Sequence, residues 1–198
     1  RTTGKVGVVT VTHGPGLSQI STALLTASRN RTPLVVVVGE YSLSGNRLQW
    51  FDQRAFAQAS EARYVTLTHK TRVARDVAEA FYIARTQSCP VVLNLPMDIQ
   101  EQSLDEPWTY RPSGEFLPAM EPTPDDDLLL PLVEALMKAE RPIIVAGRGA
   151  RMSGAYDEIV GLAERLGALL TTSLFTKDWF DGHPLNAGLA GGYCAAPT

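Results

Sequence analysis

The stretch Val6-Gly7-Val8-Val9-Thr10-Val11-Thr12-His13-Gly14-Pro15-Gly16 decides the fold of this chain. Residues 6–11 form an apolar, mostly β-branched run, which is typical of a strand buried on both faces of a parallel sheet. In residues 12–16 the glycines permit positive φ and close backbone approach, while Pro15 fixes one φ. Apolar residues then recur near the helical period over residues 17–29. The stretch therefore predicts a strand, a loop of defined shape and a helix.

The same alternation of periods continues along the chain. Further strands are predicted over residues 35–38, 64–68, 91–95, 142–146 and 169–173, and further helices over residues 53–61, 72–86, 125–139 and 156–166, with a loop at 147–150. Strands that alternate with helices are the pattern of a parallel sheet covered by helices. We therefore predict an α/β protein with parallel sheets flanked by helices.

A change in composition divides the chain. Between Asp105 and Pro124 five prolines stand among polar and aromatic residues, which is typical of a stiff linker. We predict one domain over residues 1–107, a Pro-rich linker over 108–122 and a second domain over 123–198. The chain begins without an initiator methionine and close to a buried strand, which leads us to expect a piece of a longer protein.

Composition excludes several classes of function. The chain has 198 residues, of which 44% are hydrophobic and 20% charged, and its formal net charge is −3. These values are ordinary for a globular protein and give no basic footprint for nucleic acid or for an anionic membrane. The longest apolar runs are too short to span a bilayer, so a cytoplasmic location is expected. The two cysteines and three histidines are scattered without metal-ligand spacing, so no metal site is predicted.

The glycine- and proline-containing loop lies where ligands bind in α/β proteins, at the carboxyl end of a parallel strand. On these five residues alone two interpretations stay open. The loop either approaches a ligand with its backbone or is an ordinary strand-to-helix connection.

Four segments in order resemble the thiamine-diphosphate (ThDP) enzymes related to acetolactate synthase, benzaldehyde lyase and benzoylformate decarboxylase. The loop is similar to that family's Gly-Pro-Gly loop. The other segments are Gly4-Lys5-Val6-Gly7, Arg31-Thr32-Pro33-Leu34-Val35 and Pro90-Val91-Val92-Leu93-Asn94-Leu95-Pro96-Met97-Asp98-Ile99. The resemblance implies a partial pyrimidine-binding domain followed by a partial central domain, both incomplete and Rossmann-like.

The same resemblance implies an activity for the longer protein. It would be a ThDP- and Mg²⁺-dependent homodimer or homotetramer that decarboxylates a small 2-oxo acid, or joins it to an aldehyde or another carbonyl compound. The family's glutamate is expected upstream of Arg1, and its Gly-Asp-Gly motif does not occur in this sequence. The chain alone is therefore expected to be inactive. The alternative is a non-catalytic α/β module that binds a nucleotide or supports subunit assembly.

The resemblance also implies roles for single residues. Gly14, Pro15 and Gly16 would lie against the pyrimidine ring of the cofactor. His13 stands where benzoylformate decarboxylase carries a histidine, and a neutral imidazole suits proton transfer near pH 7. In the alternative, His13 only caps the strand or bonds to backbone.

The segment Leu48-Gln49-Trp50-Phe51-Asp52-Gln53 resembles the Leu-Gln and Asp-Gln pairs of benzaldehyde lyase. In that register Gln49, Phe51 and Gln53 contribute to the substrate pocket, with the Gln49 amide able to donate and accept. In the alternative, Trp50 and Phe51 are core residues and Gln49 lies on the surface where a helix begins.

Glycines of the second domain could surround a nucleotide. Gly147, Arg148 and Gly149 follow a predicted strand, and Gly191 lies in a glycine-rich stretch near the end of the chain. The resemblance implies FAD or ADP at such loops in the central domain. Neither stretch is a Gly-x-Gly-x-x-Gly fingerprint, so an exposed turn with no ligand stays open.

Overall fold

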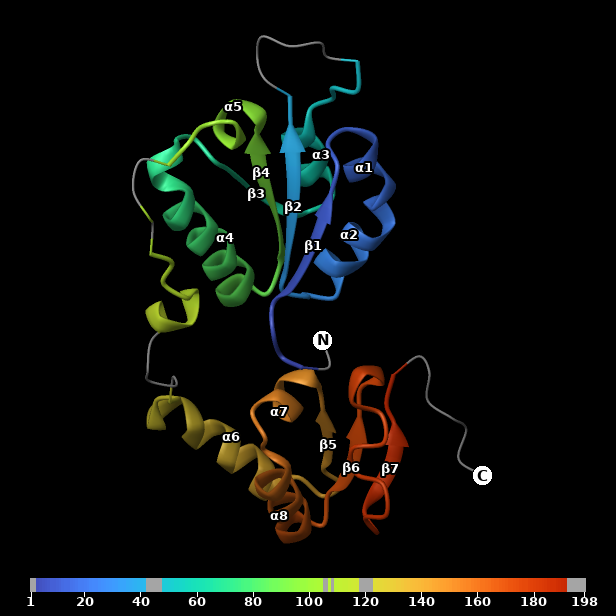
Figure 1. The fold of residues 1–198 in the computed structure, drawn as a ribbon. Coiled ribbons are helices and arrows are strands. Elements are labelled where there is room, and N and C mark those ends of the chain that lie inside the picture. Colours follow the sequence, from blue (N-terminus) through green and yellow to red (C-terminus); the bar gives the residue numbers. More distant parts are fainter. Residues whose placement is uncertain (1–2, 42–47, 105–106, 108, 118–122, 192–198) are drawn as a thin grey trace. The chain divides into compact units, whose positions relative to one another are not determined.

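The fold is described by a computed structural model for residues 3–41, 48–104, 107, 109–117 and 123–191. The chain divides into two compact units, Arg1–Met120 and Glu121–Thr198, and each is described by itself. Both contain a parallel sheet flanked by helices (Figure 1), which confirms the predicted fold class.

The first unit has a four-stranded sheet in the order β1-β2-β4-β3. The strands are β1 (Gly7–Val11), β2 (Leu34–Glu40), β3 (Arg63–Thr66) and β4 (Pro90–Pro96), and all neighbours pair in parallel. Val11 pairs with Val38, and Val38 pairs with Asn94. Because the strands run in parallel, the loops that follow β1 and β2 lie beside each other at one edge.

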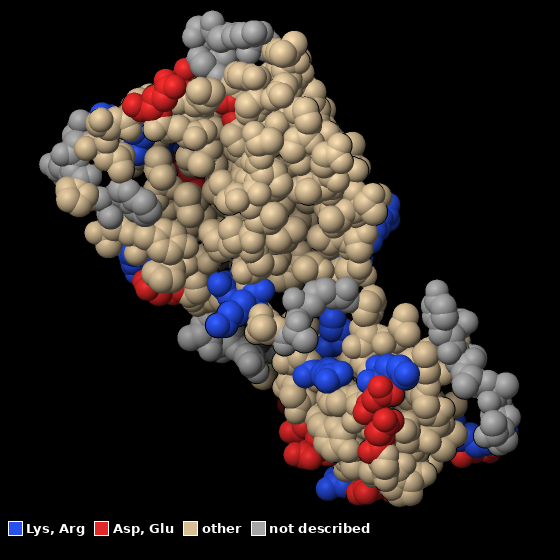
Figure 2. Space-filling model, turned by 45° about the vertical axis from the view of Figure 1, so that its right-hand side comes forward, with Lys and Arg blue, Asp and Glu red and all other residues tan. Residues whose placement is uncertain are grey.

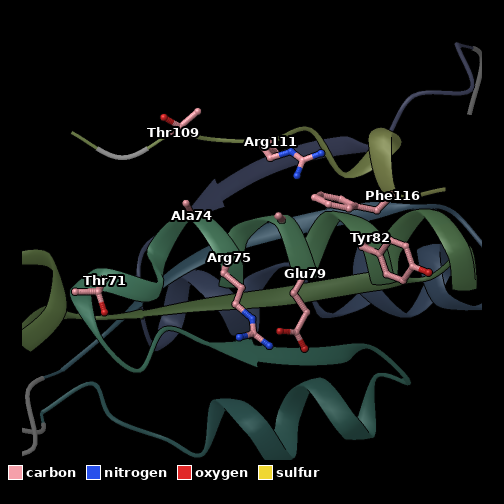
Figure 3. A pocket seen from close by; sticks show the side chains of 9 residues that line it. Thr71, Ala74, Arg75, Glu79, Tyr82, Thr109, Arg111 and Phe116 are labelled. Atoms are coloured by element: carbon pink, nitrogen blue, oxygen red, sulfur yellow. The ribbon is translucent and has the colours of Figure 1, made fainter. Parts of the chain in front are cut away.

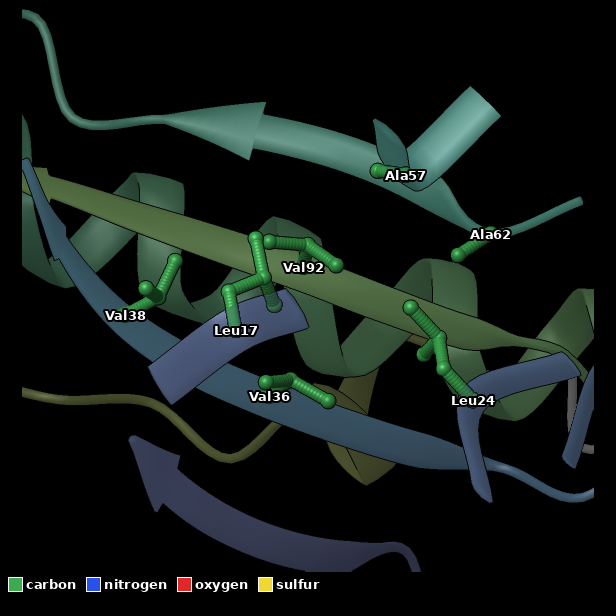
Figure 4. Close-up of a cluster of buried hydrophobic side chains, with 7 residues drawn as sticks. All are labelled: Leu17, Leu24, Val36, Val38, Ala57, Ala62 and Val92. Carbon is green, nitrogen blue, oxygen red and sulfur yellow. The ribbon is translucent and has the colours of Figure 1, made fainter. Parts of the chain in front are cut away.

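Helices cover both faces of this sheet. They are α1 (Pro15–Gln19), α2 (Ser21–Arg29), α3 (Gln53–Ala59), α4 (Val73–Gln87) and α5 (Met97–Gln100), with 3-10 turns η1 (Lys70–Arg72) and η2 (Ser113–Phe116). On one face Leu17, Leu24 and Ala57 pack against Val36, Val38 and Val92 (Figure 4). On the other, Ala80 and Ala84 of α4 pack against Val35, Val91 and Leu93. Successive residues of β2 and β4 thus pack into opposite cores, which explains why nearly all of them are apolar.

The single helix predicted over residues 17–29 is wrong, because the segment is divided between α1 and α2. Ile20 interrupts it with φ −92° and ψ 12°. The Ser18 hydroxyl donates to the Pro15 carbonyl oxygen over 3.0 Å, and such a side-chain bond competes with the helical one. Leu17 of α1 and Leu24 of α2 both reach the core, where they are 0% and 1% exposed.

The second unit has a three-stranded parallel sheet in the order β5-β6-β7. Its elements are α6 (Asp126–Lys138), β5 (Ile143–Ala146), α7 (Arg148–Met152), α8 (Tyr156–Leu166), β6 (Leu169–Thr172), η3 (Leu174–Thr176) and β7 (Asn186–Leu189). Phe180 is fully buried between Ala146, Ala163 and Leu170. Gly167 ends α8 at φ 62°, the left-handed conformation that glycine favours.

One prediction for this unit is wrong, and one of its strands was not predicted. The loop expected at residues 147–150 is the start of α7, because Gly147 is the extended residue before that helix and Ala150 packs on the core. Packing here overrides the poor helix propensity of Gly149. Strand β7 was not predicted, because its residues Asn-Ala-Gly-Leu have low β-propensity.

The segment between the two predicted domains partly packs on the first unit. Ser113 of η2 is 2% exposed, and Arg111 and Phe116 lie over α4. Residue 108 and residues 118–122 of the predicted linker lie outside the described residues. The predicted domain limits at 107 and 123 stay predictions.

The surface gives further observations. The face of the first unit that Figure 2 turns forward carries few charged side chains. The prediction that residues 6–11 form a strand buried on both faces is wrong, because β1 is an edge strand whose Gly7, Val8 and Thr10 are exposed, Val8 by 56%. Within the described ranges, no helix is both long and apolar enough to cross a membrane.

Candidate functional site

The glycine- and proline-containing loop connects β1 to α1 at the carboxyl edge of the first sheet. Pro15 is the first residue of α1, where its missing N–H leaves no helical bond unmade. The Gly14 carbonyl oxygen accepts from the N–H groups of Leu17 and Ser18 over 3.1 and 3.2 Å. The loop is therefore fixed to the helix that follows it.

Gly14 is required by the chain itself. Its backbone has φ +60° and ψ −115°, a conformation that side chains rarely permit. A Cβ on Gly14 would collide with the backbone oxygen of Gln49 and lie 3.1 Å from the Gln49 Cβ. The glycine thus allows two segments of the first unit to meet, and this contact explains its presence without a ligand.

Gly16 is in a different position. It lies in the first turn of α1, and a Cβ there would meet the Thr12 Cγ2 at 2.6 Å. Thr12 is exposed, so its methyl group can move aside by rotation. The space beside Gly16 is therefore restricted only weakly by the chain.

His13 precedes these glycines. Its ring meets the Tyr41 ring edge-to-face, with centroids 4.2 Å apart and an interplanar angle of 61°. Its Nε2 is buried and has no hydrogen-bond partner among the described residues. Because buried polar atoms are nearly always partnered, this atom is an exception that calls for an explanation.

The predicted substrate residues divide into three environments. Gln49 is exposed, and Phe51 packs on the core with its ring 5.6 Å from that of Phe56. Gln53 is 3% exposed. All three border a gap shared with His13 and Gly14, and that gap is too narrow to admit a water molecule.

The buried Gln53 amide makes hydrogen bonds to three segments: the loop after β1, strand β2 and strand β4. Its Nε2 donates to the Gly39 carbonyl oxygen over 3.0 Å and to Asn94 Oδ1 over 3.4 Å, and its Oε1 accepts from the Gly14 N–H over 3.4 Å. The Asn94 Nδ2 in turn donates to the Glu40 carboxylate. Asp52 starts α3 by accepting from the Ala55 N–H over 2.8 Å, which places residue 53 at the first turn.

Sequence analysis missed Asn94, Glu40 and Tyr41 as neighbours of this loop. A signal for Asn94 was present, since it is a polar residue inside the apolar run of β4 and is fully buried. Buried polar residues in strands are informative because they need a partner. Glu40 and Tyr41 could be placed beside the loop only once the end of β2 at Glu40 was known.

The electrostatic effect of Glu40 extends to Tyr64 on β3. Burial raises the pKa of Tyr64 to about 12, and the Glu40 carboxylate contributes to the rise. The Arg54 guanidinium lies 4.8 Å from the centre of the Tyr64 ring and opposes it.

We expect Tyr64 to make the fold sensitive to strongly alkaline solution. Since its pKa is raised in the folded chain, its contribution to stability is complete below pH 10 and is lost as the pH rises toward 12. Tyr64→Phe should therefore flatten the alkaline fall in the free energy of unfolding, measured in urea. An unchanged alkaline slope in the variant would contradict this pKa.

A groove of the first unit lies away from this loop. It has a volume of about 630 Å³ and runs between η1, α4 and the segment before the second unit (Figure 3). Its lining residues are Thr71, Ala74, Arg75, Ala78, Glu79, Tyr82, Thr109, Arg111 and Phe116. Arg111 is engaged by Glu115 over 3.3 Å and lies over the Phe116 ring. No residue of the candidate site borders this groove.

The predicted nucleotide residues lie at the carboxyl edge of the second sheet. Gly147 precedes α7, Arg148 and Gly149 are its first residues, and Gly191 follows β7 with φ +100°. The Arg148 guanidinium lies 5.8 Å from the centre of the Phe175 ring. A cavity bordered by Lys177, Asp178 and Asn186 lies in this unit, but none of the predicted nucleotide residues borders it. No group of three metal-ligating side chains occurs in the part of the chain that the structure describes.

Both units match known domain families. Residues 1–60 match the profile "Thiamine pyrophosphate enzyme, N-terminal TPP binding domain". Residues 130–198 match the profile "Thiamine pyrophosphate enzyme, central domain".

Curated proteins and a solved structure agree with these matches. The chain is 30% identical to an acetolactate synthase of Arthrospira platensis, covering 96% of the chain and 34% of that protein. It is 32% identical to a sulfoacetaldehyde acetyltransferase of Castellaniella defragrans, covering 96% and 32%. A crystal structure from Mycobacterium smegmatis, described as a thiamin diphosphate-dependent enzyme, superposes with a TM-score of 0.70 at 22% identity, covering 87% of this chain and 33% of that one. The chain thus spans about a third of the proteins it matches.

Proposed function

We propose that this chain, which belongs to the thiamine pyrophosphate enzyme family, forms one wall of a thiamine diphosphate site in a longer enzyme. That enzyme is a decarboxylase or carboligase of 2-oxo acids, related to acetolactate synthase. The match of residues 1–60 to a TPP binding domain supports a cofactor contact at the β1–α1 loop, since these residues include that loop.

The observation that carries the proposal is the buried, unpartnered Nε2 of His13. It lies in the loop at the carboxyl edge of a parallel sheet, which is where α/β proteins bind ligands. A ligand or a substrate group at this edge would give the nitrogen the partner that the described residues do not provide. The exposed Pro15 and the absence of a side chain at Gly16 fit a flat ring beside the same loop.

The residues then have separate tasks. Thiamine diphosphate, when bound, supplies the chemistry that breaks or forms the bond beside the carbonyl carbon of a 2-oxo acid. Gly14 holds the loop against Gln49, while Pro15 and Gly16 face the pyrimidine ring. His13 transfers a proton to or from the substrate through Nε2. Gln49 is exposed and contacts the substrate.

Other parts of the site come from the longer protein. The glutamate at the pyrimidine ring and the Mg²⁺-diphosphate motif are not in this sequence, so the chain alone does not turn over substrate. The enzyme is a cytoplasmic homodimer or homotetramer. FAD or ADP in the second unit would lie at Gly147, Arg148, Gly149 and Gly191.

Gly16→Ala tests the proposed cofactor wall. In the full-length protein that carries this chain, the added methyl group should meet the pyrimidine ring and weaken ThDP binding roughly tenfold or more, measured by titration calorimetry. The 2.6 Å contact with the Thr12 methyl group is removed by making the change in a Thr12→Ser background. Gly114→Ala is the matched control, since open space surrounds that glycine.

Two results would contradict the proposal. One is a ThDP affinity of the Thr12→Ser/Gly16→Ala double variant that equals the affinity of the Thr12→Ser single variant. The other is a full-length protein that binds no ThDP in the presence of Mg²⁺ but binds a nucleotide, which would favour the non-catalytic module.

A further inference from the structure

We propose that Gln53 is the positioning residue of the β1–α1 loop, and that the Glu40 carboxylate sets the direction in which its amide points. Both residues lie outside the loop itself, on α3 and at the end of β2. The effect on the loop is a property of this chain. Its consequence for cofactor binding rests on the proposed function.

The Gln53 amide alone forms hydrogen bonds to three other groups. The Gly14 N–H is buried, and its acceptor is Gln53 Oε1 at 3.4 Å. The Gly39 carbonyl oxygen and Asn94 Oδ1 accept from Gln53 Nε2. Only a side chain that both accepts and donates can bridge these three groups, and glutamine has this capacity without a charge.

The direction of the bonds is set by Glu40. An ionised carboxylate can only accept, so Glu40 requires the Nδ2 side of Asn94 to face it. The Oδ1 side of Asn94 then faces Gln53 and requires the Nε2 side of that amide. The Oε1 side of Gln53 is left for the Gly14 N–H. One charge at the edge of β2 thus orients two buried amides and, through them, the loop.

No other arrangement satisfies the network as well. Asn94 and Gln53 are 0% and 3% exposed, so water cannot replace a lost bond without opening the unit. A buried donor or acceptor without a partner is unfavourable, and partly satisfied networks are the weakest points of a core. The network therefore restricts Gly14 to the conformation seen here.

The test is Gln53→Glu in the 198-residue chain, with the hydrogen-exchange protection of the Gly14 amide as the readout. The ionised glutamate cannot donate to Gly39 or Asn94, and it adds charge beside Glu40. We expect Gly14 protection to fall about tenfold at pH 8, the equivalent of one lost hydrogen bond. The Leu67 amide, which donates to the Asn94 carbonyl oxygen, should keep its protection.

Acidification should restore the loop in this variant. Burial and the nearby Glu40 charge raise the pKa of a carboxyl group at position 53 above its ordinary value of about 4.3. Once protonated, it donates to Gly39 through its single O–H and accepts from Gly14 through its carbonyl oxygen, so it restores these two bonds of the amide but not the one to Asn94. The other titratable groups lining the same gap are His13, Glu40 and Tyr41. Wild type and the exposed control Gln58→Glu on α3 should show no such recovery.

Three outcomes would overturn the proposal. They are unchanged Gly14 protection at pH 8, a loss that acid does not reverse, and an equal loss at Gly14 and Leu67. If Gln53→Glu does not fold, Glu40→Gln decides, because it removes the charge that orients the amides. Gly14 protection should then fall severalfold, and unchanged protection would refute the role of Glu40.

The full-length protein separates this proposal from the proposed function. There, Gln53→Glu should weaken ThDP binding about tenfold at pH 8 and recover on acidification. If Gly14 protection changes as expected but ThDP affinity does not, the positioning role stands and the cofactor wall is refuted. If neither changes, the positioning role is refuted.

Discussion

Replacing Gly14 with alanine is expected to lower the free energy of unfolding of the chain by roughly 2–5 kcal/mol, from positive φ and a steric collision together. The backbone contributes because φ is +60°. The collision contributes because the new Cβ would overlap the backbone oxygen of Gln49, which cannot rotate away as a side chain can. Urea unfolding followed by circular dichroism measures the loss.

Two glycines of the same unit separate these contributions. Gly4 has φ +67° with open space around it, so Gly4→Ala reports the cost of a positive φ without a steric collision, about 1 kcal/mol. Gly114 has neither constraint, and Gly114→Ala should change stability little. A Gly14→Ala chain no less stable than Gly4→Ala would show that residues 14 and 49 do not touch in solution.

The close contact between residues 14 and 49 gives Gly14 a structural role that does not depend on a cofactor. The loop composition indicates close backbone approach, but the structure shows that the approaching group is the chain's own Gln49. Loss of activity in a Gly14 variant would therefore not distinguish a missing cofactor contact from a distorted loop. Gly16 can make that distinction, because the one close contact of an added Cβ is with the Thr12 methyl group, which can be removed by substitution.

The fold was largely predictable because its strongest signals are long. The apolar runs of β2 and β4 pack against helices on both faces, so their composition alone predicts buried parallel strands. The run of β1 predicts the strand but not its place at the edge of the sheet, where Val8 is exposed. Short elements were not predictable in this way. The start of α7 depends on Ala150 reaching the core, and β7 depends on pairing with β6.

The candidate site was predictable only in part. Its position at the end of β1 follows from the order of strand, loop and helix, and the residues near Gly14 were named from the sequence. The burial of Gln53 could not be predicted, because it depends on where Asp52 starts α3 and on Asn94, 41 residues further along. Networks between distant segments leave little trace in one sequence.

His13→Ala is expected to lower turnover of a 2-oxo acid by the full-length protein on the order of 10²-fold, the usual contribution of one acid–base group. The imidazole is the group at the loop whose Nε2 is buried and lacks a partner among the described residues. Its removal should leave ThDP affinity within about threefold, because Pro15 and Gly16 still face the cofactor. CO₂ release across a series of pH values measures the change, and the limb due to an imidazole should disappear from the pH–rate profile.

The alternative role for His13 is structural, and Tyr41 provides the control for it. The two rings meet with centroids 4.2 Å apart, so Tyr41→Leu removes this contact while keeping the imidazole. If the ring contact is all that His13 contributes, both variants should lose similar stability, about 1 kcal/mol, and keep nearly normal rates. If His13 transfers protons, His13→Ala alone loses turnover. A His13→Ala enzyme with an unchanged pH–rate profile would exclude proton transfer and leave the exposed Gln49 as the substrate contact to be tested next.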